Sequence, residues 1–322
     1  MIKAGIIGGA GYTAGELIRI LLNHPQVELV FVNSTSNAGN KLTDVHGGLL
    51  GETDMSFTDQ LPYDKIDVLF FCTAHGDTKK FLDANDIPNH LKIIDLSTDY
   101  RHKAVGNKFI YGLPELNKEG IKQSSYVANP GCFATAIQLG LLPLAKANKL
   151  TSEIHVNAIT GSTGAGVKPS ATSHFSWREN NISVYKAFEH QHLTEIKQSL
   201  NQLQANFGED INFIPVRGNF TRGIFVSTYL NYDGTIEDAQ KLYKDYYKDS
   251  PFTKLSIHER ISSLLPCFSR CRTHLFVFIT CFKSIFLSDI IVNGASGQAV
   301  HNMNLIFGLE ETVGLNLKAS AF

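Results

Sequence analysis

A glycine-rich segment at the start of the chain lies between an apolar stretch and a helical one. Lys3–Ile7 is typical of a buried strand, Gly8–Gly15 has glycines at positions 8, 11 and 15, and Thr13–Leu22 has the pattern of a helix. Glycines at such a junction permit a tight turn, and the free N–H groups at the helix start can bind a pyrophosphate. The segment therefore predicts a dinucleotide-binding fold, with a purely structural tight turn as the alternative.

The alternation of strand and helix continues through the first third of the chain. Leu29–Asn33, Asp67–Cys72 and Lys92–Leu96 are short apolar runs with helical stretches between them. Continuous apolar strands separated by helices are typical of a parallel sheet that is covered on both faces. The sequence therefore predicts an α/β protein with a Rossmann-type doubly wound parallel sheet.

Beyond about residue 131 the pattern changes to that of an α+β domain. Ile154–Thr160 and Gly223–Tyr232 are predicted to be longer strands, and the second alternates between two sets of side chains. Between these two strands a one-sided stripe at helical spacing is formed by Leu193, Ile196, Leu200, Leu203 and Phe207. Ser296–Leu309 is predicted to be one further helix.

These changes of pattern predict two domains. The first is a nucleotide-binding domain of residues 1–131, completed by residues 295–322, whose helix returns to it. The second is an α+β domain of residues 132–294, with an atypical stretch at 257–288. A chain of 322 residues with 43% hydrophobic side chains is long enough for two domains and a sizeable core.

The charge balance argues against some classes of partner. Lys and Arg number 29 and Asp and Glu number 30, so no basic excess favours a nucleic acid or a membrane surface. The longest apolar-rich run, Leu275–Leu287, is shorter than the roughly 20 residues that a membrane span needs. No leader pattern precedes the strand at Lys3, which predicts a cytoplasmic protein whose five cysteines are reduced thiols.

The second strand ends in a polar segment that bears on the choice of cofactor. Asn33-Ser34-Thr35-Ser36-Asn37 offers hydroxyl and amide groups and no carboxylate. NAD-binding sites commonly place an acidic residue here for the ribose hydroxyl, and that residue would repel a 2′-phosphate. The segment therefore favours NADP(H), although no arginine stands beside it. An ordinary polar loop is the alternative.

Cys132 has the sequence environment of a nucleophile. Asn129-Pro130-Gly131 predicts a turn and Ala134–Leu144 predicts a helix, so the thiol lies at or near a helix N-terminus. There the helix dipole and the free N–H groups favour the thiolate, and the same groups can stabilise an oxyanion. A buried structural cysteine is the alternative, and Cys72 fits it better than Cys132 does.

Two histidines before the striped helix are candidates for the base that a thiol nucleophile needs. His190 and His192 are two residues apart, so they do not share a helix face and at least one can face a cleft. A metal pair and two polar residues at a helix start are the alternatives. Zinc needs three or four ligands and no third one accompanies the pair, so we predict no metal site.

Several separated blocks resemble the N-acetyl-gamma-glutamyl-phosphate reductases of arginine biosynthesis, a family of the semialdehyde dehydrogenase superfamily. The most specific block runs from Val127 through Asn129-Pro130-Gly131-Cys132-Phe133-Ala134-Thr135 to Gly140 and Pro143 and is similar to the active-site signature of that family. The other similar blocks are Gly8–Gly15, Asp95–Arg101, Tyr111–Glu115, Gly161–Gly166, Thr221–Gly223 and Gly294–Val300 with Asn302.

The resemblance implies roles for individual residues. Cys132 would be the nucleophile and His190 the acid–base partner, with His192 the less favoured choice. The residues implied in cofactor binding are Gly8, Gly11, Tyr12, Thr13, Gly15, Ser34, Thr35, Ser36, Ser162, Gly164, Gln298 and Asn302. Those implied in substrate binding are Asn129, Arg101, His192, Arg217 and Arg222. A guanidinium suits a phosphate or a carboxylate, and the local sequence does not choose between the last two arginines.

The reaction implied by the resemblance is the NADPH-dependent reduction of an N-acyl-glutamyl 5-phosphate to the 5-semialdehyde and phosphate. The Cys132 thiolate would displace phosphate, hydride would reduce the resulting thioester, and His190 would return a proton. The second domain would carry catalysis and join subunits into a homo-oligomer, a dimer or a tetramer. An aspartate-semialdehyde dehydrogenase-like reductase and a non-catalytic NADP-binding module are the alternatives.

One segment departs from the family pattern. Ile257–Ser288 matches none of the family's blocks, and its apolar side chains fall on both faces of any strand drawn through it. We therefore predict that it does not pack as the family's strands would, either because it has diverged or because it is out of frame. A zinc site of Cys267, Cys271 and His274 is a minor alternative, since the ligand spacing is poor.

Overall fold

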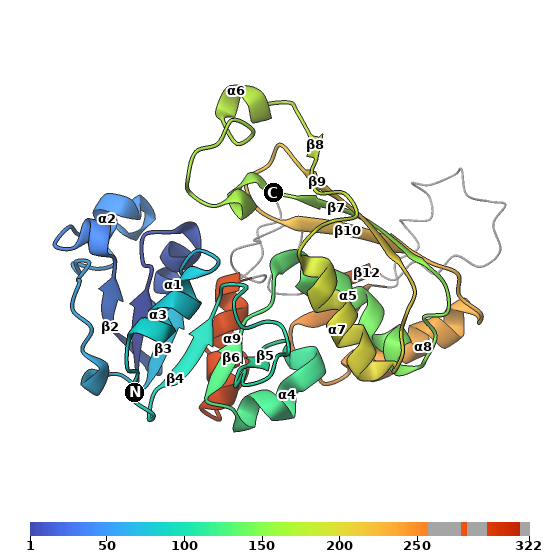
Figure 1. Ribbon diagram of the computed structural model, residues 1–322, viewed down its shortest axis with the longest axis horizontal. Helices are drawn as coiled ribbons and strands as arrows, with labels where there is room; N and C mark the ends of the chain where they lie inside the picture. The colour runs from blue at the N-terminus through green and yellow to red at the C-terminus, as the bar shows by residue number, and fades with distance from the viewer. Residues whose placement is uncertain (257–277, 282–294, 316–322) are drawn as a thin grey trace.

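Two larger β-sheets, each with its own helices, lie side by side in the computed structural model of the chain (Figure 1). The structure describes residues 1–256, 278–281 and 295–315. Apart from the strand β12 (Phe278–Cys281), the atypical stretch 257–288 and the zinc alternative within it lie outside the described residues. In the described part of the chain no helix combines the length and the apolar character that a membrane span requires.

The first sheet is parallel throughout and has the strand order β2-β1-β3-β4-β6-β5. Its strands are β1 (Ile2–Ile7), β2 (Val27–Asn33), β3 (Val68–Phe71), β4 (Lys92–Asp95), β5 (Ile110–Tyr111) and β6 (Tyr126–Ala128). All four residues of β3 are buried, as expected where helices cover both faces of a sheet. The predicted Rossmann-type sheet is therefore confirmed.

The strand order reverses at β1, because β2 and β3 lie on opposite sides of it. Ligands of doubly wound sheets bind at such a switch point.

Short helices and turns connect these strands. They are α1 (Tyr12–Leu22), η1 (Thr35–Asn37), α2 (Leu42–Val45), η2 (Gly47–Leu49), η3 (Tyr63–Lys65), α3 (Asp77–Ala84) and α4 (Pro114–Gln123). The block Tyr111–Glu115 leads into a helix, since α4 begins at Pro114. Proline suits the first position of a helix because its missing N–H would have no partner there.

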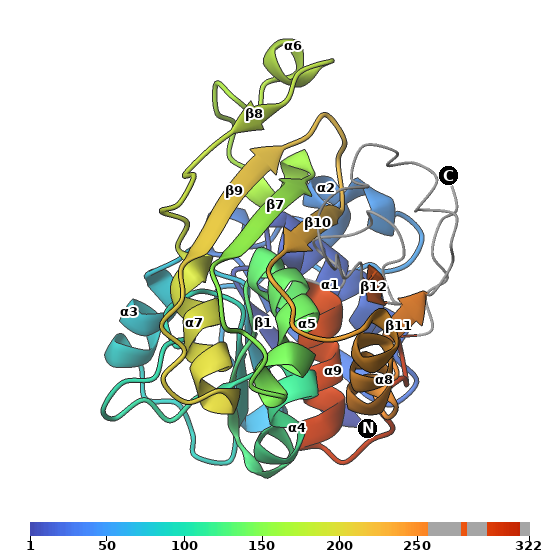
Figure 2. The ribbon, with the colours of Figure 1, turned by 90° about the vertical axis from the view of Figure 1, so that its right-hand side faces the viewer.

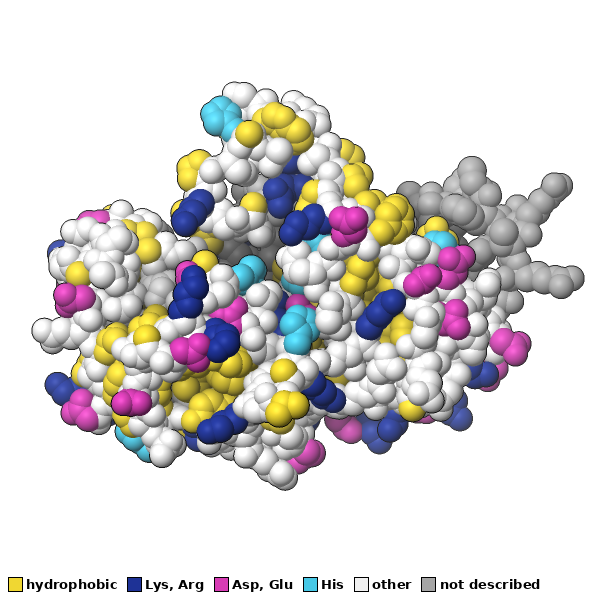
Figure 3. Space-filling model, viewed as in Figure 1, with side chains coloured by type: hydrophobic (Ala, Val, Ile, Leu, Met, Phe, Trp, Pro, Cys, Tyr) yellow, Lys and Arg dark blue, Asp and Glu magenta, His cyan; other side chains and the backbone are white. Residues whose placement is uncertain are grey.

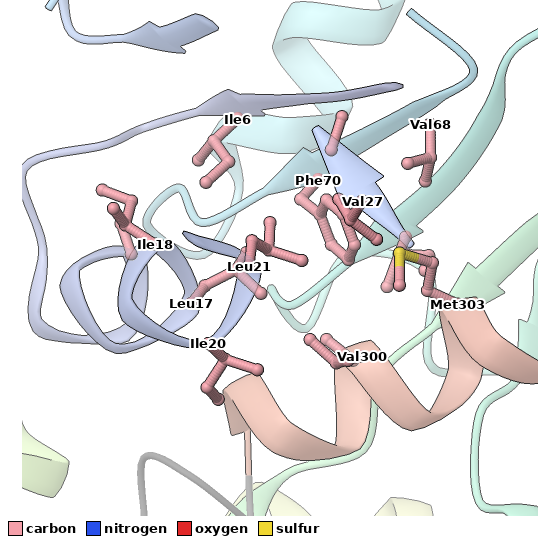
Figure 4. Close-up of a cluster of buried hydrophobic side chains, with 14 of the residues drawn as sticks. Ile6, Leu17, Ile18, Ile20, Leu21, Val27, Val68, Phe70, Val300 and Met303 are labelled. Carbon is pink, nitrogen blue, oxygen red and sulfur yellow. The ribbon is translucent and has the colours of Figure 1, made fainter. Parts of the chain in front are cut away.

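The last described helix, α9 (Gly297–Ile306), returns to the parallel sheet and packs on α1 and α4. Val300 and Met303 are fully buried in the same apolar cluster as Leu17, Leu21 and Phe70 (Figure 4). The predicted helix over Ser296–Leu309 is confirmed, although it ends three residues earlier. Residues from the two ends of the chain thus share one core.

The second sheet is mixed, with the order β10-β7-β9-β8. Strands β7 (Ile154–Thr160) and β9 (Ile211–Arg217) are parallel, and β10 (Ile224–Tyr229) and β8 (Ser183–Val184) are antiparallel to their neighbours. Figure 2 shows this sheet as a layer above α5 (Cys132–Lys146) and α7 (His192–Leu203). The remaining elements are η4 (Ser162–Ala165), α6 (Phe175–Arg178), α8 (Ile236–Tyr247) and β11 (Thr253–Ser256), which pairs with β12.

The mixed sheet with its helices confirms the α+β character predicted beyond residue 131. The alternation predicted for the strand β10 is also present, since Phe225 and Tyr229 are exposed while Ile224 and Val226 pack against the core. β10 is shorter than predicted. The striped helix also ends early, at Leu203, although Phe207 beyond it stays in the same core. The division at residue 131 stays a prediction.

Candidate active site

The nucleophile candidate lies at the start of α5, near the segment that leads into α7. Cys132 is the first residue of α5, Gly131 before it is extended, and the cysteine is half-buried. Most residues of α5 are buried, so the apolar run that predicted the helix also anchors it in the core. The space-filling view shows a hollow between the two parts of the molecule, with histidine and basic side chains at its rim (Figure 3).

The charge state of the thiol differs from the one expected from the helix end. Burial raises the pKa of Cys132 to about 11, although the backbone N–H groups of Phe133 and Cys132 and the Arg101 guanidinium lower it. The effect of the helix start is thus present but smaller than that of burial. The helix start alone predicted a thiolate, whereas a thiol with this pKa would need a base in order to act as a nucleophile.

Both predicted histidines are buried near the first turn of α5. The ring of His190 packs edge-on against Phe133, Phe213 and His192, with centroids 4.6–5.5 Å apart. Its Nδ1 accepts a 3.3 Å hydrogen bond from the backbone N–H of His192. Burial lowers the pKa of His190 to about 4 and that of His192 to about 3, so both rings are neutral at pH 7.

Glu195, which sequence reasoning missed, holds the parts of this site together. Its buried carboxylate accepts hydrogen bonds from Arg101 Nη1 (3.0 Å), the Tyr111 hydroxyl (2.9 Å) and the Gly131 N–H (3.0 Å). His192 Nε2 lies 3.8 Å from the same carboxylate. Burial alone would raise the pKa of Glu195, but Arg101 and His192 hold it below its usual value. The available signal was its place one helical turn after His192.

Two residues expected to bind substrate are engaged with the backbone. Arg101 is buried and also donates to the carbonyls of Asn129 (2.8 Å) and Leu96 (2.9 Å). The Asn129 side chain donates to the Ala295 carbonyl and accepts from Asn302. Both side chains therefore join backbone segments beside Cys132, and their contact with substrate stays a prediction.

The structure distinguishes the two arginines that the sequence left open. The Arg217 guanidinium lies 4.7 Å from the centre of the Tyr185 ring, and its buried Nε has no hydrogen-bond partner among the described residues. Burial raises the pKa of Tyr185 to about 12, and a nearby Cys132 charge acts in the same direction. Arg217 therefore belongs to the surroundings of Cys132. Arg222 instead lies 3.5 Å from the carboxylate of Glu16 on α1.

The predicted glycine loop surrounds the start of α1. Gly8 has a φ of +80°, and a Cβ there would lie 2.9 Å from the backbone of Cys72, so glycine is required. Gly15 is crowded by the His46 ring, whereas a Cβ at Gly11 would meet nothing within 4 Å. No described side chain caps the first turn, which begins at Tyr12 and Thr13. The helix start is thus open, and its free N–H groups fit a pyrophosphate.

The expected ribose segment lies at the carboxyl end of β2. Ser34 follows the strand, Thr35 and Ser36 lie in η1, and the Asn37 side chain donates to the hydroxyls of Ser34 and Ser36. The segment has no carboxylate of its own, which fits a phosphorylated ribose better than an unmodified one.

The remaining expected cofactor residues come from the second part and from α9. Ser162 and Gly164 lie in η4, at the end of β7. Gln298 accepts a 3.1 Å hydrogen bond from the Thr135 hydroxyl of α5. Asn302 is fully buried and donates to the Gly112 carbonyl and to Asn129, so its visible role is structural and its contact with a cofactor stays a prediction. Among the described residues, no cluster of His, Cys, Asp or Glu could hold a metal ion.

Comparison with known families assigns this geometry to a class. Residues 3–124 match the model of the semialdehyde dehydrogenase NAD-binding domain, and residues 132–284 match that of the semialdehyde dehydrogenase dimerisation domain. The two parts of the fold are therefore those of a semialdehyde dehydrogenase. N-acetyl-gamma-glutamyl-phosphate reductases of Parabacteroides distasonis and Bacteroides thetaiotaomicron are 61% and 62% identical to it over 322 residues, which is 100% of each chain. The chain belongs to the N-acetyl-gamma-glutamyl-phosphate reductase family, as the sequence blocks predicted.

Solved structures agree on the fold. Aspartate semialdehyde dehydrogenase II of Vibrio cholerae has a TM-score of 0.65 at 13% identity and covers 96% of this chain and 98% of its own. An aspartate semialdehyde dehydrogenase of Candida albicans, solved with NADP, has a TM-score of 0.66 at 16% identity and covers 95% and 98%. At these identities the likeness shows the architecture alone, and the sequence relatives decide the family.

Proposed function

We propose that this chain reduces an N-acyl-glutamyl 5-phosphate to the N-acyl-glutamate 5-semialdehyde with NADPH, in arginine biosynthesis. Membership of the reductase family supports the substrate class. The observation that carries the proposal is Cys132 at the first turn of α5, near two buried neutral histidines and the Arg217 side chain. A substrate with a carboxylate and a phosphate needs cations, and Arg217 has an unpartnered buried nitrogen to offer.

The proposed first step is acylation of Cys132. The thiol loses its proton, the sulfur bonds to the carbonyl carbon, and the carbon–oxygen bond to phosphate breaks with its electrons leaving on the phosphate. The N–H groups at the start of α5 would stabilise the oxyanion that forms between bond making and bond breaking. Arg217 would hold an anionic group of the substrate. When bound, NADPH supplies a hydride to the carbon of the resulting thioester.

The two histidines differ in which nitrogen they leave available. In His190, Nδ1 accepts a hydrogen bond, so the proton of the neutral ring is on Nε2. This Nε2–H is suited to protonating the oxygen that becomes negative when hydride adds to the thioester carbon. In His192, Nε2 faces the Glu195 carboxylate and the buried Nδ1 has no partner among the described residues. A carboxylate behind an imidazole is the arrangement of a general base. We therefore keep His190 in the acid–base role expected from the sequence and add His192 as the base for acylation.

The assembly and the cellular location complete the proposal. A homo-oligomer formed through the second sheet is supported by the match to a dimerisation domain and by the exposed aromatic side chains of β10. We place the reaction in the cytoplasm, where the sequence pattern predicted this chain, and where reduced thiols such as Cys132 persist.

The test is phosphate-dependent reduction of NADP⁺ with N-acetylglutamate semialdehyde, run on the wild type, Cys132→Ser and Cys72→Ser. We expect the wild type to prefer the NADP couple over the NAD couple in kcat/KM and Cys132→Ser to lose turnover while NADPH binding is retained, because a serine hydroxyl is a far poorer nucleophile. Cys72→Ser is the control, since burial and Asp95 raise the pKa of Cys72 and keep it inert. A Cys132→Ser rate above about a tenth of the wild type rules out the thioester.

A further inference from the structure

Glu16 is a buried carboxylate that the proposed reaction does not use. It lies on α1, about one turn after the helix start predicted to bind the pyrophosphate, and is 5% exposed. One of its oxygens pairs with Arg19 on the same helix, and the other lies 3.5 Å from Arg222 Nη1 in the second part of the molecule. A buried carboxylate is rarely found without a partner of opposite charge, so the contacts with Arg19 and Arg222 compensate for the burial of Glu16.

The segment that carries Arg222 also holds the turn η4. Backbone hydrogen bonds run from Ser162 N–H to the Phe220 carbonyl (2.8 Å) and from Thr163 N–H to the Thr221 carbonyl (3.0 Å). The Thr163 hydroxyl donates to the Thr221 carbonyl as well, at 2.6 Å. The turn therefore cannot move without the segment that carries Arg222.

The turn packs on this segment without a gap. A Cβ at Gly161 would lie 2.6 Å from the Thr221 carbonyl oxygen and 2.7 Å from the Arg222 nitrogen, so the two backbones are already in contact. A continuous series of contacts thus runs from α1 through Glu16 and Arg222 to the turn that contains Ser162 and Gly164.

We propose that Glu16 is a positioning residue, which fixes η4 relative to α1 through Arg222. In the proposed reaction, a dinucleotide held by its pyrophosphate at α1 must also place its reactive ring at Cys132, and Ser162 and Gly164 of η4 are the residues expected to contact it. Hydride transfer depends steeply on that placement, because reacting atoms need to lie about 3–3.5 Å apart. The inference rests on the proposed function, since it concerns how the cofactor of that reaction is held.

The ion pair has a limited strength that sets the size of the expected effect. Glu16 is buried, but the Arg222 side chain is 46% exposed, so solvent screens the pair in part. We expect Glu16→Gln to weaken NADPH binding or slow the hydride step by about 3- to 10-fold. Acylation of Cys132 in single-turnover phosphate release, which needs no cofactor, should stay at the wild-type rate.

The matched control is Arg19→Gln, which removes the other partner of the same carboxylate and leaves the inter-domain contact in place. NADPH affinity from fluorescence titration and the hydride step from single-turnover NADPH oxidation are measured for Glu16→Gln, Arg222→Gln, their double variant and the control. The double variant should match Arg222→Gln alone in NADPH affinity and in the rate of the hydride step, because both substitutions remove the same Glu16–Arg222 contact. Arg222→Gln keeps the test usable where Glu16→Gln does not fold.

The outcomes distinguish a failure of the positioning role of Glu16 from a failure of the proposed reductase function. Additive effects in the double variant, a control as impaired as Glu16→Gln, or equal losses in acylation and hydride transfer would each overturn the positioning role. A Glu16→Gln protein identical to the wild type would do so as well. A wild-type protein that releases no phosphate from the acyl phosphate, or that does not oxidise NADPH, would instead contradict the proposed function.

Discussion

The thiol of Cys132 shows how two local effects compete at one residue. The helix start and Arg101 favour the thiolate, yet burial outweighs them and keeps the pKa at about 11. A thiol that stays protonated is protected from adventitious oxidation and alkylation, since the thiolate is the reactive form. In the mechanism that we propose, the thiol is activated only where a base takes its proton, so the histidines beside it should control the acylation rate.

At the residue scale we predict that the two histidines affect different steps. His192→Ala should slow acylation more than His190→Ala does, because His192 has both the unpartnered Nδ1 and the Glu195 carboxylate behind it. His190→Ala should slow mainly the step after hydride transfer. General acid–base assistance is worth roughly 10²–10⁴-fold. Single-turnover phosphate release and NADPH oxidation measure the two steps separately.

Glu195→Gln is a second test of this assignment, since it keeps the His192 ring and removes the negative charge beside it. It should lower the acylation rate in the same direction as His192→Ala. If His190→Ala is instead the variant that loses acylation, His190 is the base, as the sequence alone favoured.

At the scale of elements, a polar cluster ties the segment after α9 to α4. Glu311 receives hydrogen bonds from His301 of α9, at 2.8 Å, and from Lys118 of α4. Burial alone would raise the pKa of the Glu311 carboxyl, but these two partners lower it from 4.5 to about 2. These polar contacts therefore hold α9 in place together with the apolar packing of Val300 and Met303.

We predict that Glu311→Gln makes the folded protein less stable by about 1–3 kcal/mol near neutral pH. A carboxyl with a lowered folded pKa stabilises the fold above its ordinary pKa of 4.5, and this contribution is lost as the pH falls toward 2. The difference in free energy of unfolding between wild type and variant, from urea titrations, should therefore shrink as the pH falls through this window. Glu310→Gln is the control, because it removes an exposed neighbouring carboxylate that bonds to Thr312 and lies outside the cluster of His301 and Lys118. It should cost less stability near neutral pH than Glu311→Gln does.

At the scale of the whole molecule, the helices that the structure describes cover one face of the mixed sheet. α5 and α7 pack beneath it, while on the other face Phe225 is 46% and Tyr229 54% exposed. A half-covered sheet with aromatic side chains on its open face is typical of a surface that pairs with a second copy. This is the physical basis for the homo-oligomer that we propose.

We predict that Phe225→Glu shifts the protein to a smaller species in sedimentation velocity at micromolar concentration. A carboxylate on this face would be buried without a partner if the second copy docked there. Val105→Glu, which puts the same charge on an exposed apolar site elsewhere, should leave the assembly unchanged. A wild-type protein that sediments as a monomer would refute the role of the sheet.

Some elements were readable from the sequence because their signals are local. The strands of the parallel sheet are continuous apolar runs, and their predicted bounds lie within two residues of β1, β2, β3 and β4. The turn before Cys132 and the helix after it need only Asn-Pro-Gly and the apolar run that follows. The strand β9 and the helix α8 were missed: β9 carries Pro215 among its apolar residues, and α8 is dominated by polar ones.

By itself the sequence determined the fold class, the family and the candidate for the nucleophile, because each depends on neighbours within a few residues. Only the tertiary structure decided which side chains surround that nucleophile and in what charge state. Arg101 and Glu195 meet across 94 residues of sequence, and Arg222 and Glu16 meet across the two parts of the molecule. Such pairings follow from how helices and sheets pack, and burial, which sets the pKa of Cys132, exists only once they have packed.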